Sequence, residues 1–266
     1  MKEQVLICKP FNLVYLGFFA VFAILFAVGV IVLRKKEEKT RAVVLALAML
    51  ITLVGFFVYK LFLSRDEAFS QITDAAGIGG FNWWGELPVQ LCNINMILIP
   101  IAALTRKRSL LCFCFFMGPL GAAFALALPS AGFECYSILL PRMIGFYGTH
   151  WMVFFGSIAL GALGLYKPSY KDLIRTVVSA LVIAFVVFLF DVVLRRSGLN
   201  RHANYFFAME TEGNPILNLF HSWLPYPFLF LLPSVLILAP YVGIVVTVAN
   251  GIQKLGHRKK AKNIAE

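Results

Sequence analysis

Residues 11–63 read FNLVYLGFFAVFAILFAVGVIVLRKKEEKTRAVVLALAMLITLVGFFVYKLFL. Two long apolar runs, 11–33 and 42–63, flank a connector, 34–41, that carries five basic residues. Each run is long enough to cross the hydrocarbon core of a membrane as a helix, which takes about 17–25 residues. The first run is too long for the apolar part of a signal peptide, and no small-residue cleavage pattern precedes the basic connector. We therefore interpret both runs as true spans.

The same pattern recurs along the whole chain. Of the 266 residues, 60% are hydrophobic and only 14% are charged, whereas soluble domains are about half apolar and a quarter charged. Seven runs have the length of a span, near 11–33, 42–63, 87–104, 110–128, 143–166, 174–195 and 224–250. The third run is the shortest and most polar, and four prolines in the last run predict an irregular entry. The sequence predicts an all-α, polytopic membrane protein: one domain, residues 1–266, forming a bundle of seven transmembrane helices.

The positions of the basic residues predict the orientation of this bundle. Connectors 34–41, 105–109 and 167–175 and the C-terminal tail together hold 16 of the 24 Lys and Arg residues. Basic residues collect on the cytoplasmic side of membrane proteins, so we expect the N-terminus outside and the C-terminus in the cytoplasm. The formal net charge of +11 thus follows the topology and forms no continuous basic face, and we expect no nucleic-acid partner.

The predicted outer connectors are longer than the inner ones. They cover 64–86, 129–142 and 196–223, and the last two contain apolar and aromatic patches that indicate short interfacial or re-entrant pieces. Cys8 and Cys135 would both lie on this outer side and could pair, although the sequence does not define a pairing.

Two other cysteines, Cys112 and Cys114, lie two residues apart on a predicted helix, so they point in different directions. With no His or carboxylate nearby, they are better explained as packing residues than as ligands, and we predict no metal site and no cofactor.

Polar residues inside predicted spans are the candidate functional residues, because such groups are costly in a membrane. The third span begins ELPVQLCNINM (86–96), with Gln90, Cys92, Asn93 and Asn95, and the fifth contains YGTH (147–150). Counted from the outer ends of their spans, Cys92 and His150 lie at similar depth, roughly 8–11 Å at about 1.5 Å per residue.

A thiol beside an imidazole has a known chemical use. The imidazole takes the thiol proton and the resulting thiolate is a nucleophile for acyl transfer. Asn93 and Asn95 would support a developing oxyanion, and Tyr147, one turn before His150, would orient its ring. The alternatives are that Cys92 is a small packing residue and that His150 bonds across helices for structural reasons.

Asp191, in the sixth predicted span, is followed four residues later by Arg195. This spacing favours an ion pair at a helix end over a role in catalysis.

Three segments resemble one family: LPVQLCNI (87–94), YGTHWMV (147–153) and the region from NYFF to NPILNLFHSWLPYP (204–227). They are similar to the YwaF-like integral membrane proteins of bacteria, whose eukaryotic relative is transmembrane protein 164. That relative is described as a cysteine-dependent acyltransferase acting on ether lysophospholipids with a Cys and a His. The resemblance implies that Cys92 and His150 hold these two roles. Bacterial members often carry a His where this chain has Gln90, so that His is not essential here, and the family's later G-P-W-P-W-Y pattern reads HSWLPYP.

Together these observations predict a multi-pass protein, implied by the resemblance to lie in a bacterial cell membrane, that acts on phospholipids and lysophospholipids. We expect a CoA-independent acyltransferase in which Cys92 forms an acyl-thioester and His150 is the general base. Four arginines near the outer helix ends are candidates for holding a lipid phosphate, or simply flank the helices: Arg142, Arg195, Arg196 and Arg201. The alternatives are a lipid hydrolase with the same residues and a non-enzymatic lipid- or solute-binding or transport protein.

Overall fold

The computed structural model describes residues 6–75 and 80–265, which are almost entirely helical. The long and short helices are α1 (Leu13–Leu33), α2 (Glu38–Leu63), α3 (Glu67–Ala75), α4 (Asn95–Thr105), α5 (Arg108–Ala127), α6 (Pro141–Ala162), α7 (Asp172–Arg196), α8 (Pro215–Trp223) and α9 (Val235–Ala265). Short 3-10 helices are η1 (Trp83–Gly85), η2 (Ala131–Phe133), η3 (Tyr205–Phe207) and η4 (Leu229–Ser234). Two-residue strands β1 (Ile7–Cys8) and β2 (Tyr136–Ser137) pair antiparallel. The predicted helical class is confirmed, with this small strand pair as an addition.

Six helical segments in the described part of the chain have the length and composition of a membrane span. They are α1, α2, α5, α6, α7 and the segment Leu229–Ile252, which joins η4 to α9. Each coincides with a predicted span. The remaining predicted span, 87–104, differs: only its second part is α-helical, as the 11-residue helix α4, and residues 88–94 form a series of turns. At about 1.5 Å per residue, α4 covers only about half of a hydrocarbon core.

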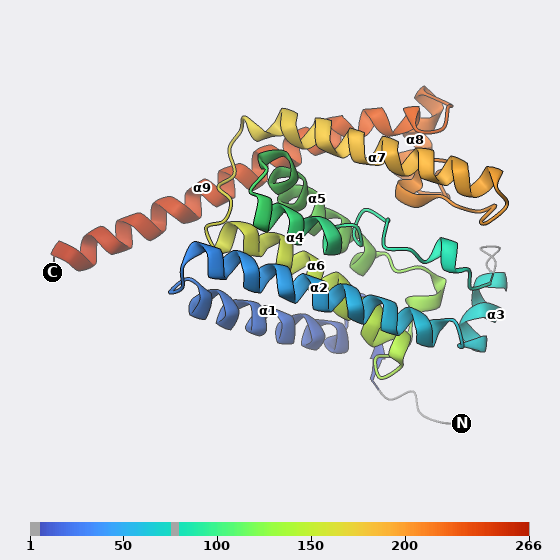
Figure 1. The fold of residues 1–266 in the computed structure, drawn as a ribbon, viewed down its shortest axis with the longest axis horizontal. Helices are drawn as coiled ribbons and strands as arrows, with labels where there is room; N and C mark the ends of the chain where they lie inside the picture. Colours follow the sequence, from blue (N-terminus) through green and yellow to red (C-terminus); the bar gives the residue numbers. More distant parts are fainter. Residues whose placement is uncertain (1–5, 76–79, 266) are drawn as a thin grey trace.

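The helices pack around α6. On one side α6 contacts α1 and α2, and on the other it contacts α5, while α4 lies between α2 and α5. Helix α7 packs on α5, and α9 packs on α7. Figure 1 shows α3 and α8 at one end of the bundle and the C-terminal end of α9 at the other. The broken segment leading into α4 is therefore enclosed by long helices.

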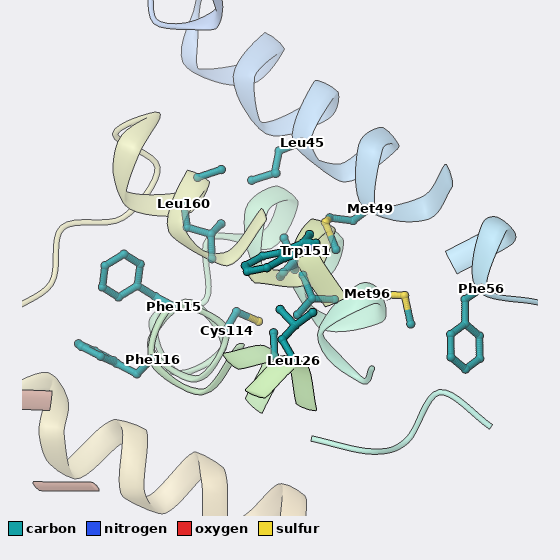
Figure 2. Packing of buried hydrophobic residues seen from close by; sticks show 14 of the residues in the cluster. Leu45, Met49, Phe56, Met96, Cys114, Phe115, Phe116, Leu126, Trp151 and Leu160 are labelled. Carbon is teal, nitrogen blue, oxygen red and sulfur yellow. The ribbon is translucent and has the colours of Figure 1, made fainter. Parts of the chain in front are cut away.

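Apolar side chains from these helices fill the centre of the bundle. Met49 of α2, Met96 of α4 and Cys114 of α5 are fully buried there, and Trp151 of α6 lies among them (Figure 2). Cys112 and Cys114 are both buried, as the packing interpretation expects.

Basic residues at one end of the bundle bind the chain where α6 ends and where α7 begins. Arg34 donates to the carbonyl of Ala162 at 2.7 Å, and Arg106 donates to Leu165 at 2.8 Å. Arg108 binds the fully buried carboxylate of Asp172 with two bonds of 2.8 and 2.6 Å. These residues come from the connectors that the charge pattern predicts to share one side, so that pattern also has a structural role.

The carboxylate of Asp172 has further partners, since it accepts from the Tyr166 hydroxyl at 2.9 Å and from the Ser169 amide at 3.0 Å. This cluster joins α5, α7 and the loop between α6 and α7.

The opposite end contains the strand pair and the short helices. Cys8 is opposite Tyr136 in the ladder, and both Cys8 and Cys135 are free thiols, with Cys8 buried and Cys135 exposed. Neighbouring strand residues point to opposite faces, which explains why the possible disulfide between Cys8 and Cys135 is absent. Burial raises the pKa of the Cys8 thiol, so this thiol stays protonated near neutral pH.

Substitution Asp172→Asn is expected to destabilise the protein by about 1–3 kcal/mol, because the buried Tyr166 hydroxyl and the half-buried Ser169 amide lose a charged acceptor. The measurement is the thermal unfolding midpoint of the protein in detergent. Glu38→Gln is the matched control: Glu38 pairs with Arg106 in an exposed position, and such pairs contribute about 0–1 kcal/mol. Equal destabilisation by both substitutions would contradict this account of the Asp172 cluster.

Candidate active site

The site lies at the break before α4. Residues 86–94 are not regular helix, so their backbone groups need partners other than their own helix. The Tyr205 hydroxyl donates to the carbonyl of Trp84 at 2.7 Å and lies 3.1 Å from the amide of Leu87. The side-chain amide of Asn95 donates to the carbonyl of Leu91 at 2.8 Å. These partners keep an irregular backbone inside the bundle.

Gln90 of the broken segment and Asp191 of α7 both bind the neighbouring loop around η3. Gln90 Oε1 accepts from the amide of Phe206 at 3.1 Å, and Asp191 Oδ1 accepts from the amide of Tyr205 at 3.1 Å. The expected ion pair between Asp191 and Arg195 is wrong, because Arg195 binds Glu210 at 2.6 Å and the carbonyl of Ala203 at 2.6 Å. Gln90 and Asp191 thus hold the loop around η3 against the broken segment and α7.

The turn that ends the break places Cys92 against His150 of α6. Cys92 Sγ lies 3.3 Å from His150 Nε2, a hydrogen-bonding distance for sulfur. His150 is 3% exposed, whereas Cys92 keeps part of its surface accessible. The structure thus brings together the two residues that the sequence placed at equal depth.

The tautomer of His150 follows from its other nitrogen. Nδ1 lies 2.6 Å from the carbonyl oxygen of Phe146, and a carbonyl can only accept, so Nδ1 carries the proton. In the neutral imidazole, Nε2 is then the unprotonated nitrogen, and it faces the Cys92 thiol. This is the arrangement in which an imidazole can take a proton from a thiol.

Phe146 also sets the plane of the imidazole, because its ring lies 4.4 Å from that of His150. Tyr147, the residue expected to orient His150, instead packs edge-on against Tyr15 and Phe146, and its hydroxyl lies toward Cys8. The orienting role therefore falls to Phe146, one residue earlier in the chain.

The backbone around the sulfur is not regular helix. Cys92 and Asn93 lie in the turn that precedes α4, whose N-terminal end carries partial positive charge. Helix α5 comes close to this turn at Gly121. A Cβ atom there would lie 3.1 Å from the Leu91 side chain and 3.2 Å from the Cys92 backbone nitrogen. Because Gly121 has no side chain, the turn that contains Cys92 can pack closely against α5.

The two asparagines differ in their surroundings. Asn95 is fully buried and its side-chain N–H is used by Leu91, so it supports the turn. Its Oδ1 faces Gly118 of α5 beside the buried Ser157 hydroxyl, and neither oxygen has a hydrogen-bond partner among the residues that the structure describes. Asn93 is 9% exposed, and in the same described part of the chain its Oδ1 has no hydrogen-bond partner either. Asn93, next to Cys92 in the chain, remains the candidate amide for the reaction.

The four arginines proposed for lipid phosphate are not equivalent. Arg142 is 4% exposed, binds Asp66 at 2.5 Å and lies over the Tyr136 ring, so its charge is used inside the protein. Arg195 is similarly engaged by Glu210 and Ala203. Arg196 and Arg201 are exposed and, within the described residues, form no ion pair. Only these two keep the accessible charge that a phosphate group requires.

The structure also contains a buried ion pair near the broken segment that the sequence analysis did not predict. Lys60 of α2 binds Glu86, which lies at the start of the broken segment, and Lys60 is 5% exposed. A lysine inside an otherwise apolar span is the signal that identifies it, because such a residue in a membrane needs a partner.

The fold and this site define a class: a multi-pass helical membrane protein with a thiol–imidazole pair at a broken helix inside the bundle. The family model of the TMEM164 family matches residues 7–245. The chain therefore belongs to the TMEM164 family, which confirms the resemblance at that level. No curated protein and no solved structure matches the chain significantly.

Substitution Gly121→Ala is expected to slow the reaction of Cys92 with a lipophilic maleimide by about tenfold, because the added Cβ displaces the turn from His150. The measurement is site-resolved mass spectrometry of Cys92 labelling over time. Gly243→Ala in α9 is the control, since a Cβ there meets nothing within 4 Å. Unchanged Cys92 labelling in Gly121→Ala would mean that the turn tolerates the added group.

Proposed function

We propose that this protein is an acyltransferase that moves fatty acyl chains between phospholipids and lysophospholipids within the membrane. The observation that carries the proposal is the contact of 3.3 Å between Cys92 Sγ and the unprotonated Nε2 of His150. Family membership and the apolar surroundings support a lipid substrate. No cofactor is required by the chemistry, and neither acyl-CoA nor nucleic acid is expected as a partner.

The reaction would proceed in two balanced steps. Cys92 Sγ attacks the carbonyl carbon of a phospholipid ester while its proton passes to His150 Nε2. The ester C–O bond breaks, the departing lysophospholipid oxygen takes the proton from His150, and an acyl-thioester remains on Cys92. The hydroxyl of a second lysophospholipid then gives its proton to His150 and attacks the thioester, and the thiol is regenerated. Asn93 and the amides of Cys92 and Asn93 are the groups proposed to stabilise the tetrahedral oxyanion.

The membrane arrangement that goes with this function has seven crossings, with the N-terminus outside and the C-terminus in the cytoplasm of a bacterial cell. Six long helices and the half-length α4 alternate in sequence with connectors at the two ends. The basic connectors share one end, in agreement with positive residues on the cytoplasmic side. In this orientation the site belongs to the outer half of the membrane, so a second phospholipid of that leaflet is a more accessible acyl donor than cytoplasmic acyl-CoA.

We infer that an apolar groove, whose lining includes neither Cys92 nor His150, holds the acyl chain. It lies between α1, α2 and α6, has a volume of about 420 Å³, and includes Tyr59 and Thr149 in its wall. These are the sequence neighbours of Lys60 and His150. A second groove of about 310 Å³ shares Phe22 and Met152 with the first and extends it along the same helices.

Two substitutions test the reaction in liposomes that contain purified protein, a labelled phospholipid and a lysophospholipid acceptor. Cys92→Ala is expected to abolish acyl exchange, and His150→Ala to lower it by about 10²–10⁴-fold, the usual contribution of a general base. Cys114→Ala, which changes another buried thiol, is the control and should retain exchange. A wild-type rate of acyl exchange in either test variant would contradict the proposed catalytic pair of Cys92 and His150. Release of free fatty acid instead of transfer would identify the hydrolase, and lipid binding without either product would identify the binding protein.

The groove has its own test. Gly148 lines it, and a Cβ there meets only the tip of the Phe22 ring at 3.9 Å, so a larger side chain fits without displacing a helix. We expect Gly148→Leu to lower exchange of long acyl chains by about tenfold and that of short chains less, because each excluded methylene loses about 0.8 kcal/mol of burial. Gly243→Leu, outside the groove, is the control. Equal effects on long and short chains would place the acyl chain elsewhere.

A further inference from the structure

Lys60 is a buried charged residue close to the broken segment that carries Cys92. This residue lies on α2, three positions before the helix ends at Leu63, and its side chain is only 7% exposed. An ammonium group at such a position is costly unless it is paired. Its ion-pair partner, Glu86, reaches it from the first residues of the broken segment.

Aromatic rings provide the remaining surroundings of the ammonium. Lys60 Nζ lies 4.8 Å from the ring centre of Tyr59, 5.3 Å from Phe56 and 5.9 Å from Phe133. A cation over the face of an aromatic ring is attracted by its negative π-cloud. The cage therefore favours the charged form of Lys60 in addition to the carboxylate of Glu86.

The same rings connect Lys60 to the reactive pair. Phe133 stacks on Phe146 at 4.5 Å, and Phe146 lies 4.4 Å from the His150 ring. The ammonium of Lys60 is thus separated from His150, and from the Cys92 sulfur that His150 contacts, by the rings of Phe133 and Phe146. A positive charge in this place favours an anion at Cys92 and opposes a proton resting on His150.

We propose that Lys60 is a positioning residue of the site, whose buried ammonium stabilises the negative charge of the Cys92 thiolate while its pair with Glu86 fixes the segment leading to Cys92. This inference rests on the proposed function, in which Cys92 is a nucleophile. If the Lys60–Glu86 pair only anchored this segment, charged side chains would not be needed. Apolar groups of the same size often stabilise a protein as well as a buried ion pair does.

Two substitutions separate an electrostatic role of Lys60 from a purely structural one by the direction in which each changes the reaction rate of Cys92. Lys60→Met removes the cation and keeps a side chain of similar length, and Glu86→Gln removes the anion and keeps the shape. Both break the same ion pair, so a structural role predicts that both slow the reaction of Cys92. An electrostatic role predicts opposite effects, since one variant loses a positive charge near the thiolate and the other loses a negative one.

The experiment measures the alkylation rate of Cys92 by a membrane-permeant iodoacetamide at fixed pH, on full-length protein in liposomes, with each cysteine resolved by mass spectrometry. The rate is expected to fall about tenfold in Lys60→Met and to rise severalfold in Glu86→Gln, as expected for a charge acting through a medium of effective dielectric about 20. Lys60→Arg keeps the charge and should stay within about threefold of wild type. The exposed Cys135 is the internal control for reagent access and should react equally in all variants.

A fall in both Lys60→Met and Glu86→Gln, or no change in Lys60→Met, would overturn the inference and leave the proposed function intact. If Lys60→Met does not fold, the direction of the change in Glu86→Gln alone decides. A wild-type Cys92 that reacts no faster than the buried Cys114 would overturn the nucleophile itself, and with it both proposals.

Discussion

The site depends on one constraint: backbone N–H and C=O groups at membrane depth need partners. In a continuous helix those partners lie within the helix, and the side chains are free to be apolar. Residues 86–94 leave the helix, so other parts of the protein must supply the bonds. Two polar side chains bind the backbone of this segment: Asn95 donates to the Leu91 carbonyl, and the Tyr205 hydroxyl accepts from the Leu87 amide. Gln90 and Asp191 in turn accept from the amides of Phe206 and Tyr205, which holds the loop that carries Tyr205. The loop around η3 is therefore part of the site's support.

The break also gives Cys92 an environment that a regular helix would not provide. In the middle of a helix, the N–H groups near a side chain are already bonded to carbonyls one turn earlier. Cys92 and Asn93 lie in the turn before α4, outside the regular helix. Helix α6 is regular at the same depth and fixes His150 by the bond to Phe146. One irregular element and one rigid element thus meet at the thiol–imidazole contact.

The sequence predicts much of this arrangement. Runs of apolar residues defined the six long spans to within a few residues of α1, α2, α5, α6, α7 and the segment into α9, because length and hydropathy dictate spanning helices. The similar depth of Cys92 and His150 in their predicted spans indicated that they could meet, and the structure places them in contact. The half-length of α4 was not predicted, since periodicity and apolar content do not distinguish a helix from a buried turn over residues 88–94.

Other features depend on pairs that only the fold brings together. Lys60 and Glu86 are 26 residues apart, and nothing in the spacing of the two marks them as partners. Arg195 has Asp191 at the helical spacing that favours an ion pair, yet the loop after α7 brings Glu210 closer. Local spacing gives a preference of only a few tenths of a kcal/mol, which a tertiary contact readily overrides.

The surroundings of the reactive pair bear on the choice between transfer and hydrolysis. A thioester on Cys92 would lie beside His150, which is 3% exposed and packed against Phe146, in a region whose wall includes Phe133. Exclusion of water protects a reactive intermediate from hydrolysis. A lysophospholipid, in contrast, arrives through the membrane with its acyl chain already in the apolar phase and its hydroxyl near the headgroup level. In the proposed reaction, the burial of His150 would favour a lipid acceptor over water, which is the physical reason to propose a transferase ahead of a hydrolase.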